Sequence, residues 1–138
     1  MKINILASYV LCIILYSTCK KDNEDHDHDD DTTTKISLNW TQPADGSTVK
    51  FNDTLRIEGS ANNTTEMHGY EVVITKASDT TVSIFDESDN LHSKALIISK
   101  KWKNGFSDST KLIVKLRVAK DHSGKNNEVF KRTIWAVK

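Results

Sequence analysis

The 138-residue chain contains only two cysteines, one proline and five glycines, and its formal net charge is zero. Equal numbers of basic and acidic residues argue against a nucleic-acid-binding protein, which carries a basic surface. The length corresponds to about one domain and excludes a large multidomain enzyme. Ala and Leu are too scarce for a helical bundle. These absences leave a small domain with a modest apolar core.

Long apolar runs are also missing, except for residues 3–15 near the N-terminus. That run follows Met1 and Lys2, and it is too short for a bilayer core that needs roughly 20 residues. It is typical of the apolar part of an export signal. The segment from Leu15 to Cys19 resembles the lipobox of bacterial lipoproteins, in the looser form that Bacteroidota use. The resemblance implies a lipoprotein signal peptide over residues 1–18 and lipid on Cys19. An ordinary secretory signal cleaved near Ser17 is the alternative.

The cysteine count agrees with lipidation. Cys12 lies inside the apolar run, so the exported chain would keep Cys19 alone and form no internal disulfide. Acyl chains such as palmitate contribute roughly 0.8 kcal/mol per buried methylene to membrane anchoring. The lysines and acids of residues 20–25 resemble the signal that sends Bacteroidota lipoproteins to the outer face of the outer membrane. A surface location is therefore expected, with the periplasmic leaflet as the alternative.

Residues 20–31 carry seven acidic residues against two lysines. A block of like charge without apolar residues cannot offset its ordering entropy, which predicts a disordered tether over residues 19–34. The same stretch offers metal ligands. Imidazoles suit Zn, Cu or Ni, and carboxylates suit Ca. The candidate ligands in this stretch are His26, His28, Asp25, Asp27 and Asp29. In a chain without preorganisation they would bind an ion weakly.

From residue 35 onward, short apolar-alternating segments are separated by turn residues. Leu112, Val114, Leu116 and Val118 face one way while Lys111, Lys115 and Arg117 face the other, as in the half-buried strand of a sandwich. Similar segments recur along the chain. Gly59 to Asn63 are expected to end the second strand, which begins at Leu55. The predicted strands lie at 36–40, 55–58, 70–74, 82–84, 95–98, 112–118 and 129–137. About seven strands without a helical pattern predict an all-β antiparallel sandwich over residues 35–138.

Several of these segments resemble bacterial immunoglobulin-like domains of surface proteins. The resemblance rests on the turn at 43–46 (Pro-Ala-Asp-Gly), the segments 53–59 and 69–72, and the hairpin at 118–125, where Lys125 replaces the usual Asn. It implies an immunoglobulin-like fold without the antibody disulfide. The whole chain is similar to Bacteroidota lipoproteins that join a His/Asp-rich tether to one such domain.

Three histidines fall in predicted loops. His68, His92 and His122 lie before the third strand, before the fifth and after the sixth, so they can meet at one end of the sandwich. With Asp121 or Glu66 they would form a metal site. Their spacing matches no recognised metal motif, and solvated loop histidines are the simpler interpretation. Asp121, His122 and Ser123 are adjacent in a tight turn and do not suit a catalytic triad.

Large aromatic and basic residues are candidates for partner contacts. Trp40 is in phase with the apolar residues of its strand and is predicted to be in the core. Trp102, between two lysines, is either an exposed contact for a sugar or protein or a lid on the core. A basic outward row is expected at Lys111, Lys115 and Arg117, with Lys131 and Arg132 beside it. Such rows are usually solvated faces.

The sequence therefore predicts a non-enzymatic, lipid-anchored surface lipoprotein. Its immunoglobulin-like domain would bind a protein or glycan partner, and no nucleic acid. The alternative is a divalent-metal-binding lipoprotein that uses His26, His28 and the nearby carboxylates, aided by the loop histidines.

Overall fold

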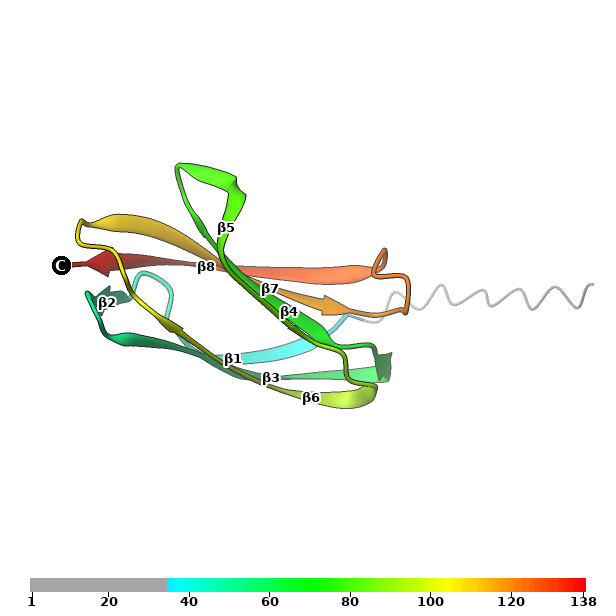
Figure 1. Cartoon of the computed structure of the whole chain (residues 1–138). Helices are drawn as coiled ribbons and strands as arrows, with labels where there is room; N and C mark the ends of the chain where they lie inside the picture. Colours follow the sequence, from blue (N-terminus) through cyan, green and yellow to red (C-terminus); the bar gives the residue numbers. More distant parts are fainter. Residues whose placement is uncertain (1–34) are drawn as a thin grey trace, which may run out of the picture. The chain divides into compact units, whose positions relative to one another are not determined.

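The computed structural model describes residues 35–138, which form eight strands (Figure 1). No helix occurs in this range, and hence none that could cross a membrane. The strands are β1 (Ser37–Gln42), β2 (Thr48–Lys50), β3 (Thr54–Met67), β4 (Tyr70–Lys76), β5 (Asp79–Asp89), β6 (Ser93–Lys103), β7 (Thr110–Ala119) and β8 (Asn127–Val137).

The strands build two sheets that pack face to face (Figure 1). One sheet has the order β1-β3-β6 and the other the order β2-β8-β7-β4-β5. All neighbours are antiparallel except β2 and β8. The predicted all-β sandwich is confirmed, with eight strands where about seven were expected.

The additional strand is β2. It follows the predicted turn at residues 43–46 and pairs in parallel with the end of β8. The turn is fixed to β8 because the amide of Gly46 donates to the carbonyl of Thr133 at 2.7 Å and Asp45 accepts from the amide of Thr133 at 2.7 Å. Through this turn the chain crosses from one sheet to the other. Three residues are too few for an alternation pattern, so sequence alone did not show the strand.

The prediction that Gly59 to Asn63 end the second predicted strand was wrong. β3 continues to Met67, because Ala61 and Met67 both face the core and are fully buried. Gly59 lies inside the strand, where a Cβ would be 2.7 Å from the carbonyl oxygen of Asn39. The glycine therefore allows β1 to approach β3 closely. The longer β3 carries the chain to the end of the sandwich at which His68 lies.

The core fills the space between the inner faces of both sheets. Alternate residues of β7 are completely buried, as the sequence pattern predicted. Ile57, Leu96 and Ile98 face them from the three-stranded sheet. Eighteen buried apolar residues form one cluster. No disulfide supports residues 35–138, which contain no cysteine, so packing alone holds the two sheets together.

The tryptophans have different surroundings. Trp40 is buried, as predicted, and the guanidinium of Arg132 lies 4.7 Å from its ring centroid. Arg132 also donates to the carbonyl of Trp40 at 2.7 Å. The prediction that Arg132 lies beside the outward basic row was therefore wrong. Trp102 lies within β6, half-buried against the core and Phe106, which supports the lid interpretation. Trp135 is 41% exposed and is the tryptophan most open to solvent.

Candidate metal site

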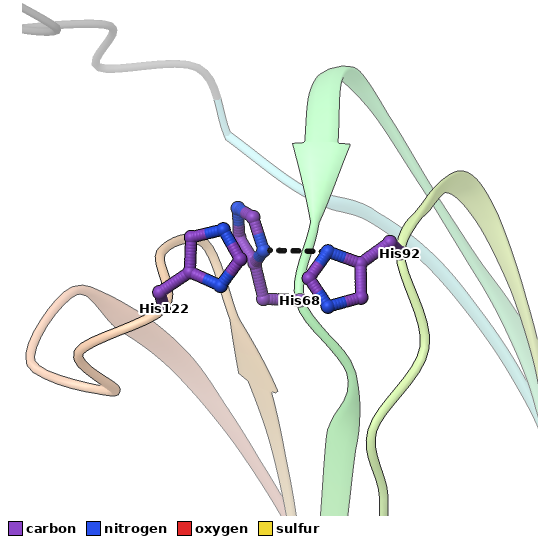
Figure 2. Close-up of side chains that lie close together, drawn as sticks. All are labelled: His68, His92 and His122. Carbon is purple, nitrogen blue, oxygen red and sulfur yellow. Dashed lines mark hydrogen bonds between the residues drawn. The ribbon is translucent and has the colours of Figure 1, made fainter.

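The three loop histidines come together at one end of the sandwich, as the sequence suggested they could (Figure 2). His68 lies in the connection between β3 and β4, and His92 in the connection between β5 and β6; both connections cross between the sheets. His122 lies in the β7–β8 hairpin. The chain also enters β1 at this end, whereas Val137 lies at the other (Figure 1).

Gly69 brings the first two loops together. Its φ is +114°, a conformation that side chains disfavour. A Cβ on Gly69 would lie 2.2 Å from the carbonyl oxygen of Asp89, where β5 ends and the His92 loop begins. Only a residue without a side chain allows this approach. Gly69 therefore allows the loops that carry His68 and His92 to lie close together.

Backbone hydrogen bonds hold the His68 loop to the end of β7. The amide of His68 donates to the carbonyl of Ala119 at 2.9 Å, and the amide of Ala119 donates to the carbonyl of Gly69 at 3.0 Å. The β7–β8 hairpin, with His122, begins at the next residue. The position of His122 relative to His68 thus follows from the sheet itself.

Asp121 organises the hairpin that carries His122. Its Oδ1 accepts from the hydroxyl of Ser123 at 2.9 Å, and its Oδ2 accepts from the amide of Asn126 at 3.0 Å. Desolvation opposes the charge of this carboxylate, but these hydrogen bonds outweigh it and lower the pKa of Asp121. Asp121 therefore positions His122. Ser123 is bonded to Asp121 instead of to an imidazole, so the three adjacent residues do not form a triad.

An ion pair anchors the end of β5, just before the His92 loop. Lys100 donates to Asp89 at 2.9 Å, and its ammonium lies 5.6 Å from the ring centroid of Tyr70. The hydrogen bonds from Lys100 and Tyr70 lower the pKa of Asp89. Desolvation opposes the charge of Lys100, yet the hydrogen bond to Asp89 raises its pKa. Because β5 and β6 belong to different sheets, the pair fastens the open edge of the sandwich.

The imidazole rings contact one another directly. The Nδ1 atoms of His68 and His92 are 3.2 Å apart, joined by a hydrogen bond in which either nitrogen can carry the proton. The rings of His68 and His122 have centroids 4.0 Å apart, and His92 lies 4.9 Å from each. One nitrogen from each histidine lies within 4.8 Å of the other two. His68 is half-buried, and the other two are exposed.

The environment favours neutral imidazole at His68. Its desolvation, followed by the proximity of His122 and His92, lowers the pKa of His68 below the ordinary value of 6.5. Neutral imidazoles have a free lone pair, which is the form that binds metal ions. A tetrahedral zinc ion with Zn–N bonds of about 2.0–2.1 Å holds its ligand atoms about 3.4 Å apart. The spacing between His68 and His92 is already close to that value.

Other candidate residues fall outside this cluster. Asp121 is a neighbour whose two oxygens are both used by its own loop. Glu66 has an oxygen 3.9 Å from Nδ1 of His92. Cys19 lies outside the described residues. So do the candidate ligands of the tail, which are His26, His28, Asp25, Asp27 and Asp29. Trp102 lies in β6 and is half-buried, so it offers little surface to a partner.

Sequence reasoning missed a second concave feature, on the outer face of the five-stranded sheet. There the β4–β5 hairpin bends away from its neighbours, where two register shifts flank Thr75 (Figure 1). The resulting groove has a volume of about 300 Å³ and is lined by Thr75, Thr81, Asp86 and Lys115, among others. Thr75 is 1% exposed and its hydroxyl has no hydrogen-bond partner. Alternation places Thr75 on the outer face, but the bend that buries it leaves no sequence signal.

Comparisons with known proteins add no functional assignment. No protein-family model matches the chain, and a search of curated proteins finds no match. The function must therefore be argued from the chemistry of the two sites.

We predict that Gly69→Ala destabilises the protein by about 1–3 kcal/mol, because the added methyl group would meet the Asp89 carbonyl and the backbone is held at positive φ. Urea denaturation measures the change. Gly46→Ala is the matched control, since Gly46 also has positive φ but open space around it. Equal losses in the two variants would contradict the steric role of Gly69.

Proposed function

We propose that this protein is an exported, lipid-anchored metal-binding protein in which His68, His92 and His122 bind one borderline divalent ion. The observation that supports it is the gathering of three imidazoles, from three different loops, with ligand atoms within 4.8 Å of one another. The topology brings these three loops to one end of the sandwich, but it does not require that each of them carries a histidine. Like-charge repulsion would also oppose such a cluster once its members were protonated.

The ligand set selects the class of metal. Three imidazole nitrogens suit Zn, Cu or Ni, whereas Ca and Mg prefer oxygen ligands. Zinc is the first choice because its tetrahedral ligand spacing agrees with the 3.2 Å between His68 and His92. Metal loading would also add stability, since an ion that binds only the folded chain shifts the folding equilibrium.

The sequence supports export and anchoring. The apolar run, the lipobox-like segment before Cys19 and the acidic residues after it fit a signal peptide over residues 1–18 and a tether over residues 19–34. The tether joins the sandwich at Ile36, whose amide donates to Glu128 at 3.0 Å near the β7–β8 hairpin. The metal site therefore lies at the tether end of the domain. An outer-membrane location facing the exterior, and a role without catalysis, are parts of this proposal.

We predict that the chain from residue 20 to 138 binds one zinc ion per molecule, because the three imidazoles are already close together. A zinc concentration 100 times Kd should raise the free energy of unfolding by about 2.7 kcal/mol. Each single change of His68, His92 or His122 to Ala should weaken binding at least about tenfold, and the triple change should abolish it. Calorimetric titration with Zn, Cu, Ni and Ca provides the measurement.

Two controls separate the loop site from the tail. A chain beginning at residue 32 lacks every candidate tail ligand and should keep the zinc site. The double change His26→Ala and His28→Ala should leave the tight site intact. Binding that disappears with the tail but survives the triple loop variant would assign the metal to the tail instead.

A second prediction concerns the anchor. Cys19→Ala should move the protein from the membrane fraction to a soluble or unprocessed form, because no other residue of the exported chain could carry the lipid thioether. Intact-mass measurement of the wild-type protein should show acylation. An unacylated mature chain, or a Cys19→Ala variant that stays membrane-bound after processing, would exclude the lipoprotein.

The groove supports a second candidate function, the docking of a polar ligand such as a glycan. The side chains of Asp86 and Lys115 make no hydrogen bond or ion pair within residues 35–138, and they line the groove with several hydroxyls. An unpartnered buried hydroxyl costs about 1–3 kcal/mol, and a ligand hydroxyl reaching Thr75 would recover that energy. This role is compatible with a metal at the other site.

We predict that Thr75→Val keeps or slightly increases the stability of the protein but removes glycan binding, because the change deletes only the unsatisfied hydroxyl. Binding is measured on an array of soluble oligosaccharides, and stability by urea denaturation. A clear loss of stability would show that Thr75 has a structural partner. Unchanged glycan binding would exclude its role as a ligand group.

A further inference from the structure

We infer that Glu66 is the fourth ligand of the ion held by His68, His92 and His122. The site would then be a closed set of three nitrogens and one oxygen. This inference rests on the proposed function, because it assigns a role to Glu66 only if the histidines bind metal. It specifies which coordination positions the protein fills and which ligands can still reach the ion.

Glu66 is placed for this role by its strand. It precedes His68 by two residues at the end of β3, and residues two apart in an extended chain project to the same side. Its Oε1 is 3.9 Å from Nδ1 of His92, the atom that also lies 3.2 Å from Nδ1 of His68. In a tetrahedral zinc site those atoms would be about 3.4 Å apart. A movement of roughly half an ångström would bring the distance between Glu66 and His92 to that value.

The carboxylate of Glu66 is free to make that movement. It accepts no hydrogen bond within the described residues, and 53% of its side chain is exposed. The acidic side chains nearby are already engaged. Asp121 accepts hydrogen bonds from Ser123 and Asn126, and Asp89 accepts from Lys100. Moving either of them to the ion would break bonds that hold the site's own loops.

A carboxylate ligand changes what the site can do. Its negative charge partly balances the divalent ion, which three neutral imidazoles cannot do. Four protein ligands also satisfy tetrahedral zinc, so no open position remains for water or a substrate. Structural zinc sites are closed in this way, whereas catalytic sites keep one position open. With Glu66 bound, the site would hold the metal without activating water.

The experiment uses cobalt(II) in place of zinc, because its visible absorption reports the number and type of ligands. The chain from residue 20 to 138 contains every described strand and core residue, and it is loaded with one equivalent of cobalt. Azide is then titrated as an external ligand. The wild-type spectrum should be that of four-coordinate cobalt and should not change with azide. Glu66→Gln should bind azide with a clear spectral change and should hold cobalt at least tenfold more weakly.

Two variants serve as controls. Glu58→Gln makes the same substitution in the same strand, away from the histidines, and should behave as the wild type. Asp121→Asn removes the other candidate carboxylate. It should leave the site closed to azide, even if it weakens cobalt binding by loosening the His122 hairpin. Denaturation curves for all variants check that each one is folded.

The outcomes test the role of Glu66 separately from the existence of the three-histidine metal site. Azide binding by the wild type equal to that of Glu66→Gln would overturn the role of Glu66 while leaving the three-histidine site intact. A site opened by Asp121→Asn and not by Glu66→Gln would also overturn it, in favour of Asp121. Absence of cobalt and zinc binding by the wild type would overturn the proposed function itself.

Discussion

The contact between Gly69 and Asp89 is the constraint on which the candidate site depends. An antiparallel sandwich sends its chain from one sheet to the other at its ends, and two of those crossings carry His68 and His92. They meet because the backbone at Gly69 lies where any side chain would strike the Asp89 carbonyl. The ladder between β4 and β7 then places the β7–β8 hairpin beside them. The geometry of three surface loops thus follows from buried main-chain packing.

This support makes the site partly preorganised. Asp121 fixes the His122 hairpin through its hydrogen bonds, and the pair of Lys100 and Asp89 fixes the end of β5. Two of the three rings are nevertheless exposed, and their ligand atoms lie within 4.8 Å of one another, which is looser than tetrahedral spacing. An ion would have to draw the three side chains together to reach tetrahedral spacing. Binding would therefore tighten loops that are already close, which costs less than ordering them from a disordered state.

The sequence predicted much of this arrangement, for identifiable reasons. Near-regular alternation, as in Leu112 to Val118, identified the long strands, and their positions in a two-sheet topology brought the three histidine loops to the same end. The features it did not predict depend on tertiary context. β2 is too short for a pattern, and the extension of β3 to Met67 depends on core contacts beyond a run of polar residues. The burial of Thr75 depends on two register shifts that no residue type marks.

The absence of a disulfide gives the proposed metal a structural meaning as well. Residues 35–138 contain no cysteine, yet the proposed export would expose the domain to conditions in which many small proteins rely on covalent cross-links. His68 and His92 are 24 residues apart in sequence and belong to connections that join opposite sheets. An ion bound to both, and to His122, would close long loops of the unfolded chain in the way a disulfide does. The free energy of metal binding would then add to the free energy of folding. Metal capture and stability would be two consequences of the same site.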